Sequence, residues 1–368
     1  MNYRINKHIS STLQNSYAKE SETDNYRISI DCYEGINNIT FSKNALETLN
    51  NINYTHIKDY PHGTLIKDSI VKYWNDKDDK NIESDNIILC DGSISGIYIV
   101  NRLFLELKDE VLGYIPQFPE YGMDVKMHGC NFDYYTLKKE NNYKFIAHEF
   151  IECINKDYKL IYIDNPNNPT GQIIPLSSIE KILEKSKKEN IMVIIDEAYG
   201  EYMDRKNSAI NLMKKFDNLI VLKTFSKGFA LAGLRAGYIV APRELKDALN
   251  KITNPYSISE IGRRISSSAL KDYDFILDTL NKSRDIKSRF MRNWKNLKMG
   301  ETSDSVSIFL LEHKNKDIVL KDEFAKWGIS VVCGSNFQSL GKNCVRFRIP
   351  SYKDLDEVIS VFECIDNL

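Results

Sequence analysis

A lysine follows an apolar stretch in the middle of the chain, and its neighbours could help it do chemistry. Residues 219–222 are apolar and lead into Thr224, Ser226 and Lys227, with Arg235 eight residues further on. The amine of a lysine can form a Schiff base with a carbonyl compound, while hydroxyls and an arginine can hold a phosphate group. Taken alone, these residue types are more typical of a solvated loop, so the motif needs support from the rest of the chain.

Two other apolar stretches are followed by residues that could bind a phosphate group or a planar ring. The segment DGSISG at 91–96 opens a predicted helix, whose first N–H groups at Ser93 and Ile94 could bind a phosphate. An ordinary helix cap by Ser93 explains the same pattern equally well. Further on, Phe118 or Tyr121 could stack on a planar ligand or could simply pack within its loop.

Polar residues also follow the stretches 160–163 and 192–195. The segment DNPNNPTG at 164–171 contains two prolines and a glycine, which favour a rigid turn that would aim the side chain of Asn168. Asp196 directly follows four apolar residues, and Tyr199 comes three residues later. A buried carboxylate is costly unless a cation faces it, and a protonated pyridine nitrogen is one such cation. A carboxylate that caps the next segment is the alternative.

The order of these stretches predicts an α/β fold. Apolar runs alternate with amphipathic or polar segments over residues 86–253, which indicates a largely parallel sheet covered on both faces. In such sheets ligands bind beyond the carboxyl ends of the strands, where the polar residues above are placed. The expected strands are 87–89, 110–115, 132–135, 160–163, 192–195, 219–222 and 236–240.

Composition excludes several classes of protein. The chain has 368 residues, 42% of them hydrophobic, and a net charge of −1, which argues against disorder and against nucleic-acid binding. The seven cysteines and six histidines show neither a disulfide framework nor metal-ligand spacing, so no metal is expected. No stretch is long and apolar enough for a membrane span or a signal peptide. We therefore expect a cytoplasmic protein that contacts neither nucleic acid nor membrane.

The regions outside the predicted sheet are less informative. Residues 1–30 are polar and predict an extended arm, and the segment 30–38 begins as a strand that breaks at Gly35, where φ is positive or a ligand approaches closely. Helices are expected at 42–51 and 65–74, with Tyr60 on a loop between them and a charged turn at 76–80. Residues 254–297 are expected to be mainly helical, followed by strands at 305–311, 329–333 and 345–349 and helices at 318–327 and 355–365.

Taken together, these motifs give the chain a family resemblance from about residue 30 to its end. The chain resembles the fold-type I pyridoxal-phosphate (PLP) enzymes, specifically the class I/II aminotransferases of the histidinol-phosphate aminotransferase group. The motifs that carry the resemblance are NPTG at 168–171, DEAY at 196–199, TFSK at 224–227 and GLRAGY at 233–238. The resemblance implies an N-terminal arm with part of a small domain at 1–40, a PLP-binding domain at 41–255, a helical connector at 256–298 and a small α+β domain at 299–368.

The resemblance also implies roles for single residues. Lys227 would form the Schiff base with PLP and later move a proton, and Asp196 would pair with the pyridinium nitrogen. Tyr199 and Asn168 would contact the ring oxygen, and Phe118 would lie on the ring face. The residues expected at the phosphate are Thr224, Ser226, Arg235, Ser93 and Ile94. Tyr60 would reach the phosphate of a neighbouring subunit in a homodimer.

The expected substrate contacts are Gly35 and an arginine of the small domain. Arg346 resembles the family arginine that grips a carboxylate or a phosphate through a planar fork. Arg348, two residues later in the same expected strand, would share its face, and only one of the two need be functional. Pro350 stands where the family usually has a glycine, which leaves the backbone near this arginine less defined.

Two activities remain open because two subgroups share these motifs. TFSK and LAGLR look like histidinol-phosphate aminotransferases, whereas Ile36-Asn37 and the PxFxEY pattern at 116–121 are similar to threonine-phosphate decarboxylase. Ile94 and Ser95 replace two acidic residues that the family usually has in the loop 91–96. We favour an aminotransferase that uses a donor such as glutamate and a small phosphorylated acceptor, with an O-phospho-amino-acid decarboxylase as the alternative. A PLP-binding regulator is a weaker third reading, because residues 1–30 are too short for a DNA-binding domain.

Overall fold

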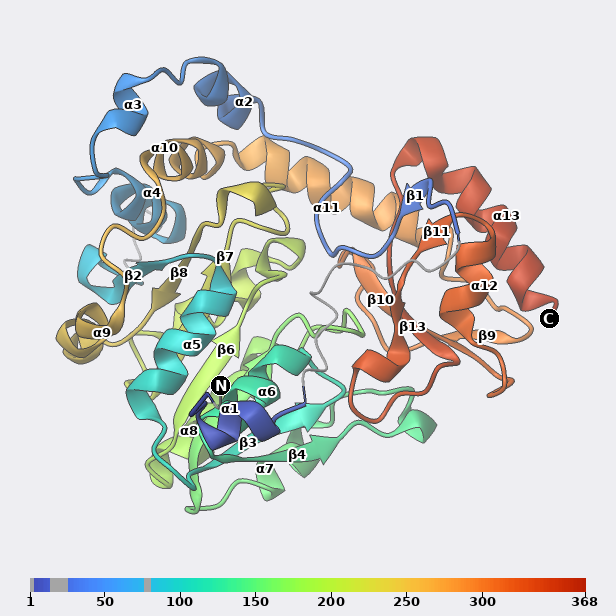
Figure 1. Cartoon of the computed structure of the whole chain (residues 1–368), viewed down its shortest axis with the longest axis horizontal. Helices are drawn as coiled ribbons and strands as arrows, with labels where there is room; N and C mark the ends of the chain where they lie inside the picture. The colour runs from blue at the N-terminus through green and yellow to red at the C-terminus, as the bar shows by residue number, and fades with distance from the viewer. Residues whose placement is uncertain (1–2, 14–25, 76–80) are drawn as a thin grey trace.

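A seven-stranded sheet forms the centre of the larger part of the molecule (Figure 1). The structure is a computed structural model that describes residues 3–13, 26–75 and 81–368. The strand formed by residues 237–240 runs antiparallel to both of its neighbours in the sheet, and all other neighbouring strands are parallel. The predicted, mostly parallel sheet is therefore confirmed. In spatial order its strands are β2 (Ile87–Cys90), β8 (Gly237–Val240), β7 (Leu219–Thr224), β6 (Met192–Asp196), β5 (Tyr158–Asp164), β3 (Glu110–Ile115) and β4 (Asn131–Thr136).

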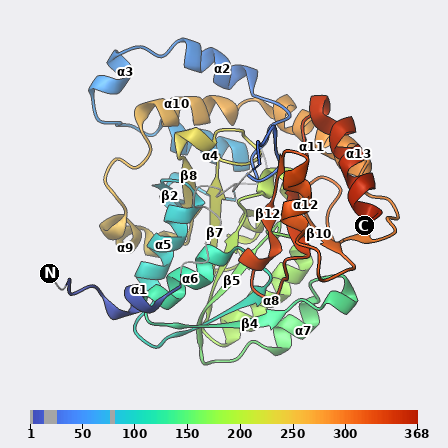
Figure 2. The same ribbon diagram turned by 45° about the vertical axis from the view of Figure 1, so that its right-hand side comes forward.

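Helices cover both faces of this sheet because its central strands are apolar on both sides. Side chains alternate along a strand, so Ile194 of β6 packs in one core while Val193 and Ile195 pack in the other. The first core also contains α5 (Ser93–Phe104), α6 (Pro119–Met127) and α9 (Lys246–Ile252). The second contains α4 (Leu65–Trp74), α7 (Ala147–Glu152), α8 (Leu176–Lys188) and α10 (Glu260–Ala269). Helix α5 crosses in front of the sheet in Figures 1 and 2.

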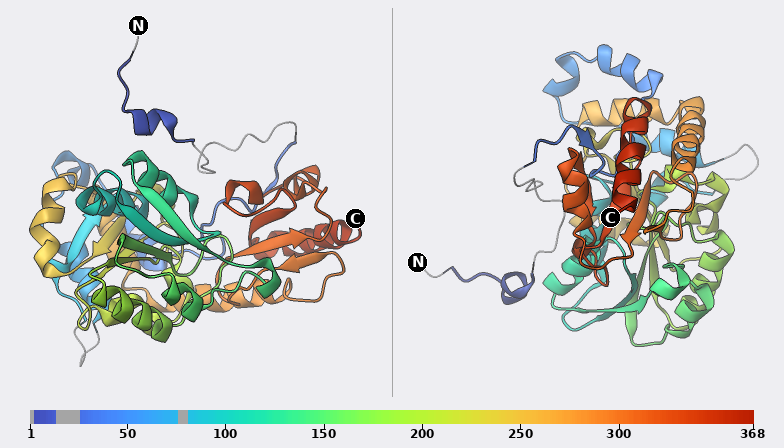
Figure 3. Two further views of the ribbon diagram at one scale, coloured as in Figure 1. Left: turned by 90° about the horizontal axis from the view of Figure 1, so that it is seen from below. Right: turned by 90° about the vertical axis from the view of Figure 1, so that its right-hand side faces the viewer.

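A smaller α+β part, with its own apolar core, lies at the other end of the molecule (Figure 3). Its antiparallel sheet has the order β12 (Val332–Cys333), β13 (Cys344–Arg348), β10 (Ile308–His313) and β9 (Leu297–Met299). Helices α12 (Leu320–Lys326) and α13 (Leu355–Asp366) pack against this sheet. Helix α11 (Tyr273–Ser288) runs from the large part to the small one (Figure 1).

The N-terminal segment joins this smaller part. Strand β1 (Ile30–Asp31) pairs in parallel with β11 (Ile329–Ser330), almost three hundred residues later in the chain. The strand expected at 329–333 is therefore divided into β11 and β12, which belong to different sheets. Strand β9 was not expected, because three residues with one polar member give no usable alternation.

The helices before the large sheet form close to where they are expected. Helix α2 (Lys43–Asn50) begins after Ser42, whose hydroxyl accepts a hydrogen bond from the N–H of Ala45 at 3.2 Å. The short helices α3 (Thr55–Lys58) and α1 (Lys7–Ser11) were not expected, and α1 lies beside α6 in Figure 2. The charged turn expected at 76–80 and residues 14–25 of the expected arm lie outside the described residues. In the described ranges, no helix is long and apolar enough to cross a lipid bilayer.

Candidate active site

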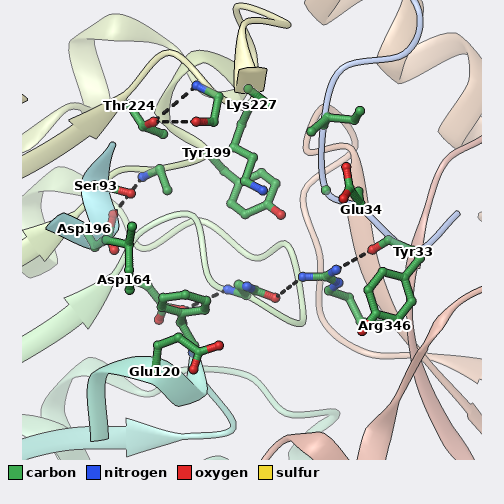
Figure 4. A pocket seen from close by; sticks show the side chains of 18 of the residues that line it. Tyr33, Glu34, Ser93, Glu120, Asp164, Asp196, Tyr199, Thr224, Lys227 and Arg346 are labelled. Atoms are coloured by element: carbon green, nitrogen blue, oxygen red, sulfur yellow. Dashed lines mark hydrogen bonds between the residues drawn. The ribbon is translucent and has the colours of Figure 1, made fainter. Parts of the chain in front are cut away.

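A cavity of about 790 Å³ lies between the carboxyl ends of the central strands and the smaller part of the molecule. The large part contributes Lys227, Asp196 and Tyr199 to its wall, and the other side is formed by residues 33–36 and by Arg346. Figure 4 shows Lys227 and Tyr199 on one side, with Glu34 and Arg346 opposite them. Of the residues expected from the sequence, those that line this cavity are Gly35, Ser93, Ile94, Phe118, Asn168, Asp196, Tyr199, Thr224, Ser226, Lys227, Arg235 and Arg346.

Lys227 follows β7 directly and points into the cavity. Its Nζ lies 5.6 Å from the centre of the Tyr199 ring. Burial lowers the pKa of Lys227 to about 8, and the nearby charge of Arg346 acts in the same direction. A lysine with this pKa has a substantial neutral fraction near pH 8, and the neutral amine is the form that attacks carbonyl groups.

A buried charge cluster lies beneath the loop that carries Lys227. Lys223 Nζ lies 3.3 Å from Glu197 Oε2 and 2.9 Å from Glu201 Oε1, with all three side chains inaccessible to solvent. Glu201 also packs against Gly228, where an added Cβ would lie 2.4 Å from the Glu201 Cβ. The cluster therefore ties the end of β7 to the segment after β6, and it fixes the path of the lysine loop.

Asp196 ends β6 and is buried, as its place after four apolar residues implies. Its Oδ2 accepts a hydrogen bond from the Tyr162 hydroxyl at 2.8 Å, and its Oδ1 accepts one from the N–H of Ala198 at 3.0 Å. Burial raises the pKa of Asp196 to about 7 even though the Tyr162 bond opposes the shift. A cation placed against this carboxylate would therefore be bound strongly and would hold it in its charged form.

Tyr199 and Asn168 place hydrogen-bonding groups beside Lys227. The Tyr199 hydroxyl is buried and has no hydrogen-bond partner among the described side and main chains. Asn168 Oδ1 accepts a hydrogen bond from Arg346 NH1 at 3.2 Å. The backbone N–H of Asn168 donates to Asp164 Oδ2 at 3.0 Å, which anchors the rigid turn that the prolines predict. An unpartnered buried hydroxyl is costly, so it marks a place where a ligand atom can bind.

Hydroxyls and backbone N–H groups gather at the start of α5. The Thr224 hydroxyl donates to Ser226 Oγ at 3.0 Å, and Arg235 NH1 donates to the same oxygen at 3.4 Å. Gly92, not Ser93, is the N-cap of α5, with φ of 84° and no side-chain cap. An L-residue rarely adopts this φ, and an added Cβ at Gly92 would lie 2.8 Å from Arg235 NH2. The first N–H groups of the twelve-residue helix and this guanidinium form a cradle whose donors and positive charge suit an anion.

The two arginines of β13 have different surroundings. Arg346 lines the cavity and also contacts the carbonyl of Tyr33. Arg348 does not line it, and its NH2 instead forms an ion pair with Asp31 Oδ2 at 2.8 Å. The structure thus distinguishes two arginines that the sequence could not. Residues two apart in a strand share one face, but this spacing does not show which of the two side chains reaches the cavity.

The structure decides between the possibilities that the sequence left open at two residues, and it leaves the expected contact of Tyr60 with a neighbouring subunit untested. Tyr121 is fully buried and stacks on Tyr162 with ring centres 3.6 Å apart, so Phe118 alone of the two reaches the cavity. Gly35 does not have a positive φ, and what approaches it closely is the Tyr199 hydroxyl, 1.7 Å from an added Cβ. Tyr60 is exposed, stacks on Tyr256 and does not line the cavity of its own chain.

Several cavity residues were missed in the sequence. Tyr33, Glu34 and Glu120 line the wall, and Tyr162 holds Asp196 from behind. A polar tyrosine within the apolar run of β5 was a usable signal for Tyr162, because buried hydroxyls need a partner. No local pattern singles out the segment that contains Tyr33 and Glu34, since the pairing of β1 with β11 brings it to the cavity.

Comparison with known proteins identifies the family. A curated histidinol-phosphate aminotransferase from Ruminiclostridium cellulolyticum is 30% identical over 303 residues, which cover 80% of this chain and 81% of that protein. The structure of histidinol-phosphate aminotransferase from Sinorhizobium meliloti in complex with pyridoxal-5'-phosphate matches with a TM-score of 0.82 at 18% identity, covering all of this chain and 98% of that one. L-threonine-O-3-phosphate decarboxylase from Porphyromonas gingivalis matches with a TM-score of 0.75 at 18% identity, covering 92% of this chain and all of that one.

The two structural matches concern the fold, which both activities share. The family model for aminotransferase class I and II matches residues 37–362, which is nearly the whole chain. The resemblance drawn from the motifs at 168–171, 196–199, 224–227 and 233–238 is thereby confirmed. This chain belongs to the class I and II aminotransferase family.

Proposed function

We propose that the chain is a PLP-dependent aminotransferase that moves an amino group between an amino acid such as glutamate and a small phosphorylated carbonyl compound. The enzyme class follows from membership of the family. The observation that carries the assignment of the site is the convergence of Lys227, Asp196 and the cradle at Ser93 on one cavity. The phosphorylated substrate is inferred from the curated relatives, which are histidinol-phosphate aminotransferases.

The residues around the cavity fit PLP. The cradle of Ser93, Thr224 and Arg235 suits its phosphate, and the buried carboxylate of Asp196 suits the protonated ring nitrogen. The unpartnered hydroxyl of Tyr199 suits a ring oxygen. Asn168, whose Oδ1 accepts from Arg346, also lines this cavity, and its side-chain NH₂ is a donor of the kind that a ring oxygen needs. Phe118, at the cavity wall, offers a ring face.

The protein residues direct the chemistry that the cofactor supplies. When bound, PLP withdraws electrons from the carbon that carries the substrate amino group, which weakens the bonds to that carbon. Asp196 keeps the ring nitrogen protonated. Lys227 Nζ removes the proton from the substrate carbon and returns it at a different position, because its lowered pKa lets it act as base and then as acid. Arg346 holds an anionic group of the substrate on the opposite wall.

Replacing Arg346 should weaken substrate binding far more than replacing its neighbour in β13. Charge-assisted hydrogen bonds contribute about 1.5–3 kcal/mol, so Arg346→Gln should raise the KM for anionic substrates roughly 10- to 100-fold. Arg348→Gln is the matched control, because Arg348 pairs with Asp31 and not with the cavity. It should lower the melting temperature and leave KM within about threefold of the wild-type value. Steady-state kinetics on both variants would refute the assignment if Arg348→Gln had the larger effect on KM.

The rate at which PLP reacts with cofactor-free protein should depend on pH through Lys227. Because burial lowers the pKa of Lys227 to about 8, the amine is protonated below that pH and neutral above it. The rate should therefore rise with pH up to about 8 and then level off. Stopped-flow absorbance of PLP measures this rate. A rate that still climbs about tenfold per pH unit between 8.5 and 10 would indicate a lysine with the ordinary value near 10.4.

Transamination and decarboxylation can be separated in one experiment. The enzyme is incubated with glutamate and, separately, with O-phosphothreonine or O-phosphoserine, and the formation of pyridoxamine phosphate and the release of CO2 are both measured. An aminotransferase converts the cofactor to pyridoxamine phosphate with glutamate and releases no CO2. Rapid CO2 release from a phospho-amino acid without pyridoxamine phosphate would overturn the proposal in favour of the decarboxylase.

We further propose a homodimer that works in the cytoplasm. Tyr60 is exposed and stacks on Tyr256 with ring centres 4.7 Å apart. In the proposed dimer its hydroxyl contacts the phosphate site of the second copy. The described cysteines are all free thiols, which fits a reducing compartment. Sedimentation at twice the chain mass of 42.6 kDa tests the dimer.

The proposed domain limits are 1–40, 41–255, 256–298 and 299–368. The pairing of β1 with β11 supports assigning the N-terminal segment partly to the small domain. The connector contains α10 and α11, the second of which reaches the small domain.

A further inference from the structure

Asn37 lies where the N-terminal wall of the cavity meets the lysine loop. Its backbone N–H donates to the Lys227 carbonyl at 3.2 Å. Its side-chain Nδ2 lies 3.0 Å from the Gly228 carbonyl and 3.3 Å from Thr279 Oγ1. One buried residue thus contacts the lysine loop through both its main chain and its side chain, and it reaches helix α11 as well.

The other side-chain atom of Asn37 holds its own segment in shape. Its Oδ1 accepts hydrogen bonds from the N–H groups of Ile39 at 2.9 Å and Thr40 at 3.2 Å. The Thr40 hydroxyl in turn lies 2.6 Å from Thr279 Oγ1, and Thr279 donates to the carbonyl of Phe275 in α11. The amide oxygen therefore fixes the local turn, while the amide nitrogen contacts Thr40 Oγ1 of that turn at 3.1 Å and also makes the contacts to Gly228 and Thr279.

The segment that precedes Asn37 is anchored at its other end to the small part of the molecule. Strand β1 pairs with β11, and the N–H of Arg348 donates to the carbonyl of Cys32 at 3.1 Å. Between these anchors, residues 33–36 form the cavity wall that faces Lys227, and Gly35 lies directly against the Tyr199 hydroxyl. Only a few residues thus separate the anchor on the small part from the backbone bond to Lys227.

The loop that carries Lys227 is also packed tightly on the side that faces away from Asn37. Gly228 packs against Glu201, where an added Cβ would lie 2.4 Å from the Glu201 Cβ, and Asn37 contacts its carbonyl from the N-terminal segment. Gly228 is therefore held between the buried charge cluster and Asn37. Loss of the Asn37 side-chain contact would leave Gly228 held by Glu201 alone, with only the backbone bond of Asn37 to Lys227 remaining on the other side.

We propose that Asn37 is a positioning residue that sets the place of the Lys227 amine relative to the cavity wall and couples it to the small domain through α11 and β1. The inference rests on the proposed role of Lys227 as the proton-transferring group. Misplacing such a group by about 1 Å can cost about 100-fold in rate. Losing Asn37 should therefore slow proton transfer, even though Asn37 touches neither substrate nor cofactor.

Two variants remove the side-chain contacts by different routes. Asn37→Asp keeps the oxygen that fixes the turn but replaces the donor to Gly228 and Thr279 by a carboxylate. Thr279→Val removes the hydroxyl on α11 without adding charge. Asn38→Asp is the matched control, because Asn38 is the next residue and is exposed.

The test measures kcat and the kinetic isotope effect with glutamate deuterated at Cα. We expect Asn37→Asp to lower kcat about 10- to 100-fold, Thr279→Val to lower it less, and both to increase the isotope effect because proton transfer becomes more rate-limiting. Asn38→Asp should match the wild type in both quantities.

The possible results separate a failure of the inference about Asn37 from a failure of the proposed function. A kcat that falls only in proportion to the folded fraction, with an unchanged isotope effect in both variants, would show a merely structural role and overturn the inference. Wild-type values in both variants would overturn it as well. If reduction with borohydride fails to attach PLP to Lys227 in the wild-type protein, the proposed function itself fails, so the two failures are distinguishable.

Discussion

Lys227→Ala should abolish turnover, with kcat at least about 10⁴-fold below the wild-type value. The amine supplies both the point of attachment for the cofactor and the group that moves the proton, and no other described lysine lines the cavity. The variant should remain folded, because Lys227 is not a member of the buried charge cluster beneath its loop. Steady-state kinetics with glutamate, together with circular dichroism, measure the two quantities.

Two controls distinguish loss of the amine from loss of charge. Lys227→Arg keeps a cation at the position but cannot act as a base at neutral pH, so it should be as inactive as the alanine variant. Small primary amines such as methylamine should partly restore the activity of Lys227→Ala, because they can enter the space vacated by the side chain. Substantial activity in Lys227→Ala without added amine would contradict the assigned role.

Asp196→Asn should lower kcat about 100- to 1000-fold, since it removes the charge that keeps the ring nitrogen protonated. An asparagine has nearly the same shape, and its single amide oxygen can still accept the hydrogen bond from the N–H of Ala198. Its NH₂ takes the place of the oxygen that accepts from Tyr162 and can donate to the tyrosine hydroxyl instead. PLP should still attach to Lys227, because the phosphate cradle is untouched. Rapid-scan absorbance and kcat measurements separate attachment from turnover.

Tyr162→Phe is the graded control for Asp196. It removes the hydroxyl that donates to Asp196 Oδ2 but leaves the carboxylate in place. We expect a loss of about tenfold in kcat, which is the lower end of what a hydrogen bond to a charged group contributes, because the carboxylate charge itself is kept. A larger loss in Tyr162→Phe than in Asp196→Asn would show that the carboxylate charge is not what matters.

The large sheet was predictable from the sequence because its strands are buried on both faces. Runs such as 192–195 are continuous and apolar, and several of the other strands, such as β2, β3 and β5, are followed by a helix that covers one face of the sheet. All seven predicted strands form, and most of them are longer than expected, as with β5 at Tyr158–Asp164, which begins two residues earlier and ends one residue later. The ends differ because a strand continues for as long as its neighbour offers hydrogen bonds, which a single stretch of sequence does not reveal.

The site was predictable where a residue is fixed by its own strand and not where a distant segment supplies it. Lys227, Asp196 and Asn168 each follow a strand of the parallel sheet, so the fold brings them together at one edge. The sequence left both Phe118 and Tyr121 as possible stacking rings. The structure separates them, because Phe118 is the N-cap of α6 and lines the cavity, whereas Tyr121 lies within α6 and stacks on Tyr162 in the core.

The opposite wall of the cavity depends on long-range pairing. Tyr33 and Glu34 reach it through β1 and β11, which are far apart in the sequence. Which of Arg346 and Arg348 faces the cavity likewise depends on Asp31, whose carboxylate forms an ion pair with Arg348. Neither contact has a local sequence signature.

The most direct test of this account is to locate the covalent bond to the cofactor. The protein is incubated with PLP, reduced with borohydride, digested and mapped by mass spectrometry. The account predicts a yellow protein whose reduced digest carries a single pyridoxyl group on the peptide that contains Lys227, and none in Lys227→Ala. A colourless protein, or a pyridoxyl group on another lysine with Lys227 unmodified, would contradict it.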